Sequence, residues 1–435
     1  MLRTHYAKEL KAGKNITVAG WLHEKRVLGS IVFAVVRDFT GLVQITAKKG
    51  VTDDSIMELL KDLKRESVIS VTGDAVDNKQ APNKLEILPK NINVISLAEN
   101  LPIDISPGIK TTLDKRLDWR SIDLRKPEHN AVFRVQSTLV QEMQLFLKKE
   151  GFVQVFTPSL MGSASESGAE LFSVVYYDKE AFLRQDPQLH RQLSVAAGLE
   201  RVYDVGPSWR AELSHTTRHL SEHRTIAAEM AFITDEYDVI SLEEEMIRFA
   251  IERLVKDCRD ELDILGIKLD VPKKKFPVLE FPDLYDVLKT LGEKVEYGKA
   301  SYGPDGEKKL GEYVKNEFGS DFFFVNRFPF AEKPFYVMRV DKDPTWARSI
   351  DLIYKGMEMS SGGQREHRHD KLVQQLREKK MSMDSIRWFT DFFKFGVPPH
   401  GGFSIGIERL TMQILNLPNV REAVLFPRDV DRLTP

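Results

Sequence analysis

The chain has 435 residues, a length that corresponds to two or three domains of ordinary size. It carries 63 basic and 65 acidic side chains, so no overall basic field indicates a nucleic-acid partner, which would have to meet a local patch. A single cysteine, Cys258, excludes a disulfide framework and a cysteine-rich zinc site and is typical of a reducing compartment.

The first residues, MLRTHYAKEL, lack the apolar core of a signal peptide. No apolar run approaches the roughly 20 residues that a membrane span needs. We therefore expect a cytoplasmic protein with no membrane partner.

Residues 1–100 contain short runs of alternating apolar residues that are separated by turn residues and predict β-strands. The five runs are KNITVAGWL, SIVFAVVRD, GLVQITAKK, ESVISVTGDAV and KLEILPKNINVISL. With one helical stretch near residues 53–64, they favour a small closed barrel of the oligonucleotide-binding kind. Phe33 and Trp21 offer rings on which bases could stack, although an aromatic side chain in a strand more often belongs to the core.

Residues 101–128 carry Pro102, Pro107, Gly108 and Pro127 among polar residues and predict a linker, which leaves 129–435 as a second domain. In AVFRVQSTLVQEMQLFLKKEGF, apolar residues recur at spacings of three and four and predict an amphipathic helix that ends at the glycine. The following FVQVFTP predicts a strand.

Two segments with candidate site residues follow in the chain. MGSASESGAELF, with Glu166 at its centre, has the small residues of a mobile loop and could equally be a plain connection. In RQDPQLHRQLSVAAGLERVYDVG, a turn at Asp186 and Pro187 precedes a helix and then a strand.

The stretch from Ser208 to Met230, SWRAELSHTTRHLSEHRTIAAEM, places many charges between two apolar runs. A strand, a charged loop and a returning strand would form a hairpin with Arg210 at its base. By itself this pattern fits a phosphate-handling site and an ion-paired surface ribbon equally well.

The remaining sequence predicts helix over residues 236–262 and a mixed region, interpreted as an insertion, over about 265–345. SIDLIYKGMEMSSGGQREH predicts a strand with Glu358, a polar glycine turn and then Arg365. VPPHGGFSIGIERLTMQIL predicts a glycine-rich strand that runs into a helix with Glu408 and Arg409.

The glycines of GGFSIGIERL follow neither the phosphate-loop order nor the dinucleotide-binding fingerprint. Arg210 and Arg409 could instead contact separate phosphates of a nucleotide, because guanidinium groups suit phosphate oxygens. Glu358 and Ser361 offer oxygen ligands for Mg²⁺, which binds through few protein groups plus phosphates.

Three ordered motifs resemble those of class II aminoacyl-tRNA synthetases. The R-A-E of Arg210 to Glu212, followed by T-T-R-H-L-x-E, is similar to the second motif, and G-x-G-x-E-R after P-P-H-G is similar to the third. The helix before EGFVQVFTP resembles the first. From RTHY at the start to FPRDxxRLTP at the end, the chain is similar to archaeal-type aspartyl-tRNA synthetases.

The resemblance implies an α+β chain with an N-terminal OB-fold barrel that binds the anticodon and an antiparallel catalytic sheet flanked by helices. It implies a homodimer joined through the first motif, with ATP and Mg²⁺ as cofactors and L-aspartate and tRNA-Asp as substrates. Aspartate would first form an adenylate and then pass to the 3′ end of the tRNA. Such catalysis rests on orientation and charge stabilisation.

The resemblance also assigns site residues. The implied ATP-binding set is Arg210, Glu212, Arg218, His219, Leu220, His223, Glu358, Gly406, Ile407, Glu408 and Arg409. Within it, Arg210 would hold the α-phosphate and the substrate carboxylate, Glu212 the adenine amino group, and Arg409 the γ-phosphate and the adenine face. Arg218 and His219 would lie near the outer phosphates, and Glu358 and Ser361 would bind Mg²⁺.

The implied amino-acid-binding set is Glu166, Asp186, Gln188, Arg191, Arg210, Ser361 and Arg365. Arg365 would pair with the side-chain carboxylate of aspartate, and Glu166 and Gln188 would receive its ammonium group. The implied anticodon set is His23, Phe33, Gln44, Pro82 and Glu86. Phe33 would stack on the central base, with Gln44 and Glu86 at base edges.

The amino-acid pocket departs from the family pattern. The family's Q-S-P-Q-x-x-K-Q becomes Q-D-P-Q-L-H-R-Q, with Asp186 for serine and Arg191 for lysine. Ala227 stands at a family aspartate, and His223 at the adenine-stacking position. We hypothesise that Asp186 replaces the negative charge missing at Ala227, so that the charge of the pocket is unchanged.

Several alternatives remain. Asparaginyl enzymes usually have Gly-Gln and a glutamate where this chain has Pro-Gln and Arg191, so the pattern favours aspartate. His23 and Pro82 resemble the relaxed family type that also charges tRNA-Asn, where strict enzymes tend to have tryptophan and lysine. A synthetase-like paralogue without tRNA would not need Phe33 and Gln44, and a silent RNA-binding protein would lose its arginines or Glu358.

Overall fold

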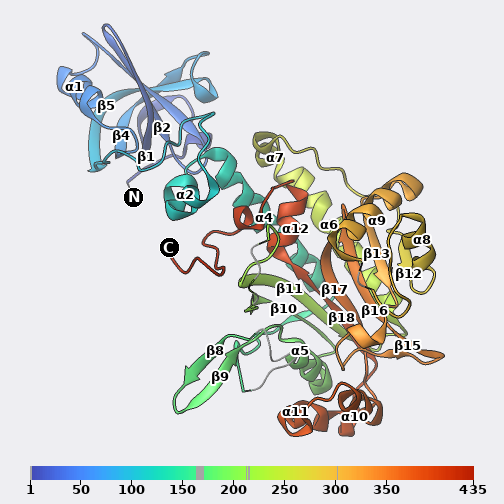
Figure 1. The fold of residues 1–435 in the computed structure, drawn as a ribbon. Coiled ribbons are helices and arrows are strands. Elements are labelled where there is room, and N and C mark those ends of the chain that lie inside the picture. Colours follow the sequence, from blue (N-terminus) through green and yellow to red (C-terminus); the bar gives the residue numbers. More distant parts are fainter. Residues whose placement is uncertain (1, 163–170, 212, 214–215, 301) are drawn as a thin grey trace. The chain divides into compact units, whose positions relative to one another are not determined.

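The computed structural model describes residues 2–162, 171–211, 213, 216–300 and 302–435. Glu166 and Glu212 of the predicted site lie outside the described residues. The chain divides into two compact units, Met1–Asp104 and Ile105–Pro435 (Figure 1). Each unit is described by itself.

The first unit is a closed five-stranded barrel with the strand order β1-β2-β3-β5-β4. Its strands are β1 (Gly13–Leu28), β2 (Ile31–Arg37), β3 (Leu42–Lys48), β4 (Val68–Asp77) and β5 (Leu85–Ser96), and α1 (Asp54–Asp62) lies between β3 and β4. Alternate apolar residues of the strands fill the interior together with one face of α1. The prediction of an OB-fold barrel with one helix is confirmed.

The predicted linker differs from the structure. It contains two short helices, α2 (Leu113–Asp118) and α3 (Arg120–Asp123), that belong to the second unit. Arg120, which is 1% exposed, donates hydrogen bonds to the carbonyls of Glu422, Val424 and Leu425. The prolines and polar residues of this stretch predicted a loop. The helices were missed because the contacts that hold them are made with residues about 300 positions away in sequence.

The second unit is built on an eight-stranded sheet with the order β12-β13-β16-β17-β18-β11-β10-β6. These strands are β6 (Val153–Gln154), β10 (Arg201–Trp209), β11 (Glu222–Ala231), β12 (Val278–Glu280), β13 (Phe322–Asn326), β16 (Ser349–Tyr354), β17 (Met357–Arg365) and β18 (His400–Gly406). Neighbours from β13 to β10 pair antiparallel, and only the edge strands β12 and β6 pair parallel. The expected antiparallel catalytic sheet is therefore present.

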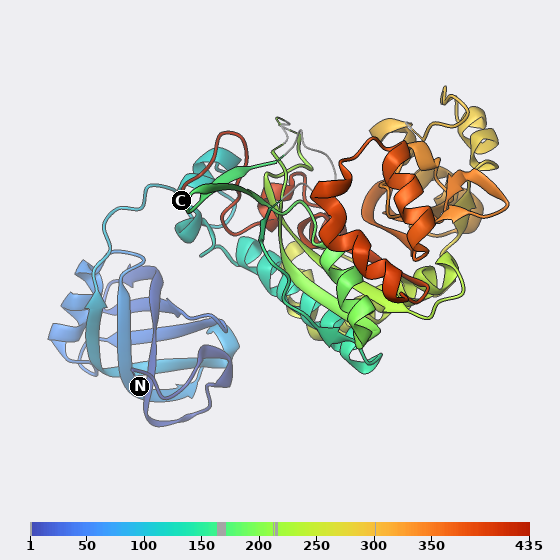
Figure 2. The ribbon, with the colours of Figure 1, turned by 90° about the horizontal axis from the view of Figure 1, so that it is seen from below.

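Helices cover the sheet and enclose the main core. The helices α4 (Pro127–Lys149), α6 (Glu236–Asp257), α7 (Arg259–Leu265) and α12 (Ile407–Ile414) share one apolar cluster with the sheet (Figure 1). A second cluster joins α5 (Gln188–Ser194), α10 (His369–Glu378) and α11 (Met383–Thr390), which lie together in both views (Figures 1 and 2). No helix in the described ranges is long and apolar enough to cross a membrane.

The region 265–345 is more than an insertion. It supplies β12 and β13 to the main sheet, and β13 is buried along its whole length. It also forms α8 (Leu284–Thr290) and α9 (Gly303–Phe318), which pack in a separate apolar cluster. No motif is readable here in the sequence, because a fully buried strand shows no alternation of apolar and polar residues.

The prediction of a polar glycine turn before Arg365 is wrong. The chain turns earlier, at Lys355 and Gly356, and SSGGQR continues β17. Gly362 pairs with Ile350 of β16 on one side and with Phe403 of β18 on the other. Pairing on both sides holds Gly362 and Gly363 in the sheet, although Gly363 has a positive φ of 137°, and this pairing is not visible in a local sequence pattern.

The remaining strands form two small sheets. One contains β7 (Leu160–Met161), β9 (Lys179–Leu183) and β8 (Ser173–Tyr176), and the other contains β14 (Arg339–Val340) and β15 (Asp343–Ala347). Short helical turns include η5 (Phe330–Glu332) and η7 (Val420–Ala423). The predicted hairpin is confirmed, because β10 and β11 pair antiparallel from Arg201 with Met230 to Trp209 with Glu222.

A buried carboxyl group makes stability depend on pH. Glu243 of α6 is 0% exposed and accepts a hydrogen bond from Ser360 of β17, and burial raises its pKa to about 8. The unfolded chain releases this proton above pH 4.5 or so, whereas the folded chain keeps it up to about pH 8. The wild-type fold therefore loses stability between these values, by on the order of 1 kcal/mol per pH unit.

Glu243→Gln removes this titration. We expect its free energy of unfolding, relative to wild type, to rise between pH 5 and pH 8 in urea denaturation. Exposed Glu252 on the same helix provides the control variant Glu252→Gln, for which the difference from wild type should not change with pH. A constant difference for Glu243→Gln would show that this carboxyl group is ionised in the fold.

Candidate functional site

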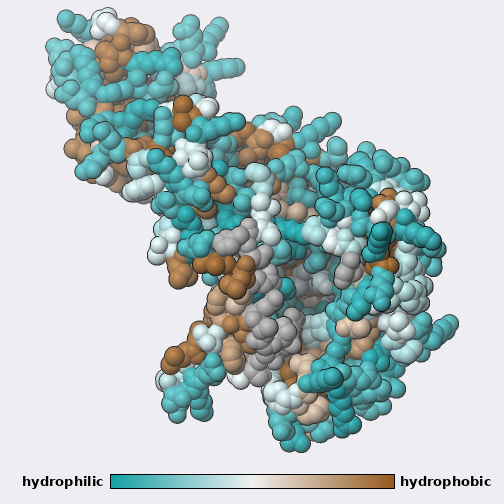
Figure 3. Space-filling model, in the orientation of Figure 1, coloured by the Kyte–Doolittle hydropathy of each residue, from teal (hydrophilic) through white to brown (hydrophobic). Residues whose placement is uncertain are grey.

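A cavity of about 460 Å³ opens on the second unit between the β10–β11 hairpin, β16 to β18 and α12. Figure 3 shows the hollow with hydrophilic side chains around it. The cavity brings together most of the predicted ATP-binding and amino-acid-binding residues. These are Asp186, Gln188, Arg210, Arg218, His219, Leu220, His223, Glu358, Ser361, Arg365, Gly406, Glu408 and Arg409. Arg191 and Ile407 are buried behind the wall.

The base of the hairpin is held by backbone hydrogen bonds from distant segments. The amide of Arg210 donates to Ser221 at 2.9 Å, and the amide of Ser221 donates to Arg428 near the C-terminus at 3.0 Å. Glu408 of α12 accepts from the amide of Arg224 with both oxygens, at 3.0 and 3.2 Å. These contacts fix the position of Arg210 on the cavity wall.

His223 lies on β11 opposite Ser208 of β10 and faces the cavity. Burial, together with the nearby charges of Arg210 and Arg409, lowers its pKa to about 4. The imidazole is therefore neutral at physiological pH. A neutral ring on the wall of this cavity suits the face of an aromatic base.

Two arginines at this end of the cavity are paired with glutamates. Arg409 of α12 donates to the backbone oxygen of Glu358 at 3.1 Å and lies 3.7 Å from its carboxylate. Arg218 donates to Glu307 of α9 at 3.1 Å. Both guanidinium groups are therefore held at the cavity rather than free in solvent.

Asp351 extends the predicted Mg²⁺ pair of Glu358 and Ser361. It lies on β16 opposite Ser361 of β17, is 8% exposed and is hydrogen bonded to Ser361. Burial and the charge of Glu358 raise its pKa, while Lys333, 3.3 Å from both carboxylate oxygens, opposes this shift.

This oxygen set fits a cation that needs few protein ligands. No group of three or more His, Cys, Asp and Glu side chains suited to a metal is present among the described residues. Mg²⁺ usually takes one or two carboxylates and completes its shell with phosphates and water, which matches Asp351 and Glu358. The signal missed in the sequence was a single aspartate inside the apolar strand SIDLIY.

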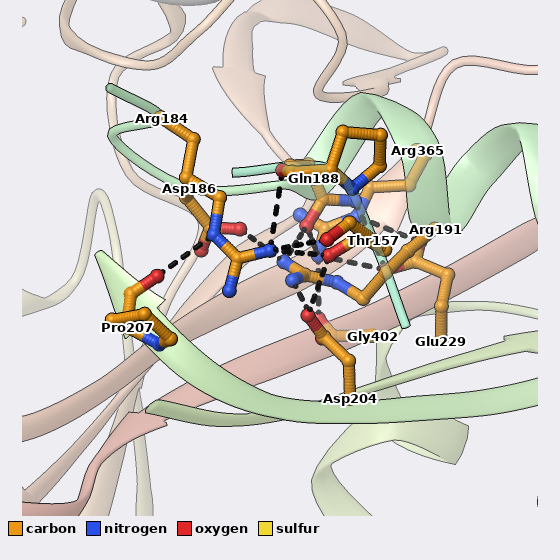
Figure 4. Close-up of polar contacts among 11 residues, drawn as sticks. Thr157, Arg184, Asp186, Gln188, Arg191, Asp204, Pro207, Glu229, Arg365 and Gly402 are labelled. Atoms are coloured by element: carbon orange, nitrogen blue, oxygen red, sulfur yellow. Dashed lines mark hydrogen bonds and ion pairs between the residues drawn. The ribbon is translucent and has the colours of Figure 1, made fainter. Parts of the chain in front are cut away.

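The other end of the cavity contains a buried network of charges (Figure 4). Arg191 is 0% exposed and donates to Asp186 at 2.6 Å, to Gln188 at 2.8 Å and to Asp204 at 3.1 Å. Burial opposes the ionisation of Asp186, but the charge and hydrogen bond of Arg191 outweigh it and lower its pKa. An ionised carboxylate thus faces the cavity, with its counter-ion behind it.

Arg365 forms the second half of this network. Its guanidinium donates to Glu229 at 3.0 Å and to the carbonyl of Gly402 at 2.9 Å (Figure 4). Gln188 joins the halves, because it donates to Glu229 at 3.0 Å and accepts from Arg365 at 3.2 Å. A Cβ on Gly402 would lie 2.5 Å from a Glu229 carboxylate oxygen, so only glycine leaves room for this carboxylate.

Two carboxylates of the network were not predicted. Glu229 and Asp204 are buried in strands whose neighbours are apolar, in IAAEMAF and VYDVG. A charged residue between apolar neighbours in a strand was the available signal. Asp204 lies opposite Ala227, so their Cβ atoms share one face of the sheet. The negative charge near Arg191 therefore comes from Asp204 as well as Asp186.

The predicted anticodon residues lie on the barrel. Phe33 is half-buried and does not belong to the apolar core, so its ring does not fill the interior of the barrel. It pairs with Thr46 of β3, and Thr46 and Gln44 both donate to Glu86 of β5. Phe33, Gln44 and Glu86 therefore belong to one surface of the barrel.

The two other predicted barrel residues are placed separately. His23 is hydrogen bonded to Arg37 at 2.8 Å, and Arg37 also pairs with buried Glu66 at 2.8 Å. Pro82 begins a short helical turn, Pro82–Lys84, between β4 and β5. Trp21 lies under the guanidinium of Arg37, 5.8 Å from the ring centre, and is half-buried.

Comparisons with known proteins agree with this geometry. Residues 112–430 match the family described as tRNA synthetases class II (D, K and N), and residues 16–95 match the OB-fold nucleic acid binding domain. Similar relatives include an aspartate–tRNA(Asp) ligase of Thermococcus kodakarensis, 43% identical over 100% of both chains. An aspartate–tRNA(Asp/Asn) ligase of Aeropyrum pernix is 40% identical, covering 99% of this chain and 97% of its own.

Solved structures are similar over the whole chain. Asparaginyl-tRNA synthetase from Pyrococcus horikoshii, complexed with asparaginyl-adenylate, superposes with a TM-score of 0.93 at 33% identity and covers 100% of both chains. A structure described as an aspartyl-tRNA synthetase from Leishmania major has a TM-score of 0.88 at 29% identity and covers 98% of this chain and 92% of its own.

The buried network predicts a large effect of removing its central cation. Arg191→Met would leave Asp186 and Asp204 without their shared partner, and breaking a buried ion pair in this way lowers the free energy of unfolding by about 3–5 kcal/mol. Urea denaturation at neutral pH measures the change. Arg191→Lys keeps the charge and should lose clearly less, and Arg201→Met tests an exposed arginine of the same unit. A loss from Arg191→Met no larger than that from Arg201→Met would contradict this interpretation.

Proposed function

The chain belongs to the class II tRNA synthetases of the aspartate, lysine and asparagine group, and we propose that it joins L-aspartate to tRNA in an ATP-dependent reaction. The observation that carries the proposal is one cavity with Arg210, Arg218 and Arg409 at one end and Arg365 at the other. The first end suits a triphosphate and the second an amino acid with a carboxylate side chain.

In the first step, the α-carboxylate of aspartate attacks the α-phosphorus of ATP. The bond to the bridging oxygen breaks, pyrophosphate leaves and aspartyl-adenylate forms. Arg210, held by the hairpin base, would stabilise the charge that develops on the α-phosphate. Arg218, His219 and Arg409 would hold the outer phosphates, and neutral His223 would lie against the adenine with Leu220 and Gly406 nearby.

In the second step, a hydroxyl of the terminal tRNA ribose attacks the carbonyl carbon of the adenylate, and AMP leaves. Mg²⁺, when bound, would neutralise phosphate charge and orient the pyrophosphate that leaves in the first step. Asp351, Glu358 and Ser361 would hold it. The chain's own contribution is orientation and charge placement, because no covalent enzyme intermediate is required.

The amino-acid end supports aspartate. Arg365 would receive the side-chain carboxylate, and Gln188 the ammonium group. Glu166, on a segment outside the described residues, would complete the ammonium site. Asparagine is the second candidate, because the Pyrococcus horikoshii neighbour is described as an asparaginyl-tRNA synthetase.

The tRNA would be read by the barrel. Phe33 would stack on the central anticodon base, with Gln44 and Glu86 at base edges. His23 and Pro82 support recognition of tRNA-Asn as well as tRNA-Asp. Two of the similar relatives are named aspartate–tRNA(Asp/Asn) ligases, which agrees with this interpretation.

A homodimer is part of the proposal. The segment after α4 exposes three large apolar residues, Val153 at 48%, Phe156 at 88% and Leu160 at 45%. Exposed apolar side chains clustered in one segment are typical of a protein interface. A cytoplasmic location also stays a prediction.

The proposed reaction is tested by ATP–pyrophosphate exchange with purified enzyme. We expect exchange that requires L-aspartate and Mg²⁺, with asparagine and no-amino-acid reactions at background. Exchange without any amino acid would contradict the enzyme assignment. Exchange with asparagine alone would select the asparaginyl enzyme, and exchange without later tRNA charging would select a paralogue that has lost tRNA.

The same assay tests whether Asp186 compensates for Ala227. Asp186→Ser restores the family residue but removes one of the two carboxylates that pair directly with Arg191 among the described residues and leaves Asp204. We expect kcat/KM for aspartate to fall about tenfold, which corresponds to about 1.4 kcal/mol. Asp186→Asn separates charge from size, and a rise in kcat/KM for Asp186→Ser would refute the compensation hypothesis.

Relaxed tRNA specificity is tested by aminoacylation. Wild-type enzyme should attach aspartate to transcripts of both tRNA-Asp and tRNA-Asn. The double variant His23→Trp, Pro82→Lys should keep charging tRNA-Asp. Its kcat/KM for tRNA-Asn should fall by at least about tenfold, which corresponds to about 1.4 kcal/mol. Failure of the wild-type enzyme to charge tRNA-Asn would show that it is strict.

A further inference from the structure

Helix α9 reaches the nucleotide end of the cavity from the region 265–345. It contacts β16 and β17, the strands that carry Asp351 and Glu358, and lies beside β13 and β16 in Figure 1. Its first turns carry Glu307, which is paired with Arg218. This ion pair joins two segments 89 residues apart in sequence.

A direct contact between backbones fixes where α9 lies. A Cβ on Gly311 would be 2.6 Å from the amide nitrogen of Gly356, and a Cβ on Gly356 would be 2.7 Å from the Cα of Lys308. The helix therefore touches the turn between β16 and β17 with no side chain between them. Glu307 lies four residues before Gly311, on the same side of the helix. Its carboxylate is thereby set at a defined distance from β17.

The loop that carries Arg218 is held just before this residue. The carbonyl of Thr217 accepts from the amide of Val420 at 2.8 Å, and the carbonyl of Thr216 accepts from Arg421 at 3.2 Å. The backbone is thus anchored to η7, and the arginine side chain reaches across to Glu307. Contacts with η7 therefore fix the backbone next to Arg218, and the contact with Glu307 of α9 fixes its guanidinium group.

We propose that Glu307 is a positioning residue that holds the Arg218 guanidinium at the cavity for the outer phosphates of ATP. Arg218 lines the cavity and Glu307 does not, so Glu307 acts through the arginine. The inference rests on the proposed function, since it assumes that this end of the cavity binds a triphosphate. It gives α9, for which the sequence showed no role, a part in nucleotide binding.

Glu307 differs from the carboxylate that pairs with the other arginine. Glu358 pairs with Arg409 and also belongs to the oxygen set that fits Mg²⁺, so a bound metal would compete with Arg409 for this carboxylate. Glu307 lies outside that set and can keep Arg218 throughout. An arginine fixed in advance loses less conformational freedom when phosphate binds, which strengthens binding.

The ion pair of Glu307 and Arg218 lies partly in contact with solvent. Its side chain is 20% exposed and that of Arg218 is 22% exposed, so the pair is partly screened by solvent. Burial raises the pKa of Glu307, while the charges of Arg218 and Arg409 oppose this. A partly screened pair contributes little to folding, and its loss should therefore change binding more than stability.

The test is Glu307→Gln in the full-length enzyme, assayed by ATP–pyrophosphate exchange. We expect the KM for ATP and for pyrophosphate to rise about 2- to 5-fold, because a partly exposed ion pair contributes up to about 1 kcal/mol and a tenfold change needs about 1.4 kcal/mol. The KM for aspartate and the inhibition constant of AMP should not change, because neither ligand has the outer phosphates. Glu312→Gln, an exposed glutamate on the same helix, should match wild type in every constant.

Two further variants make the test independent of folding. Glu307→Asp keeps the charge on a shorter side chain and should show a smaller rise in the KM for ATP. In an Arg218→Ala background, Glu307→Gln should have no further effect, because the group it positions is gone. Thermal unfolding of each variant reports whether the fold is kept.

The inference is overturned if Glu307→Gln leaves the KM for ATP unchanged or lowers it. It is also overturned if AMP binding weakens equally, or if the effect persists in the Arg218→Ala background, because each result would place Glu307 in the general structure of the site. Absence of aspartate-dependent exchange in the wild-type enzyme would instead contradict the proposed function.

Discussion

The buried pair of Arg365 and Glu229 is the interaction on which the second unit is arranged. Glu229 is 0% exposed on β11, and Arg365 ends β17, two strands away across β18. Their contact over Gly402 requires these three strands to be in register, and Gln188 extends it to α5. Isolated buried charges are very unfavourable, so a fold that misplaces any of these elements leaves a charge without its partner.

This network divides the cavity into two kinds of site. At the amino-acid end, the charges of Asp186, Arg191, Glu229 and Arg365 are paired inside the protein, and recognition depends on small differences among these fixed carboxylates and arginines. At the nucleotide end, Arg218 is paired with Glu307 and Arg409 with Glu358 near the surface, where phosphate groups can approach. The substitutions at Asp186, Arg191 and Ala227 all fall at the first end, so they bear on substrate choice more than on phosphoryl chemistry.

Much of the architecture could be predicted from the sequence because its signals are local. Alternating strands predicted the barrel, a three- and four-residue period predicted α4, and two charged motifs predicted the hairpin and the strand before α12. The resemblance of these motifs to a known family then placed Arg210, Glu358 and Arg409 in one cavity, where the structure also has them. Glu212 and Glu166 lie outside the described residues.

What the sequence did not reveal depends on contacts between distant residues. Asp351, Asp204 and Glu229 each stand alone among apolar neighbours, and their partners lie on other strands, so no local spacing relates them. The same holds for α9. Its Glu307 carboxylate lies near the nucleotide end of the cavity because Gly311 and Gly356 let the helix touch the β16–β17 turn. For Asp351, Asp204 and Glu229, the signal that a sequence reading could use is a charged residue inside an apolar strand. For α9, the close approach of helix and turn is a property of the folded backbone, and only the structure relates this contact to the nucleotide site.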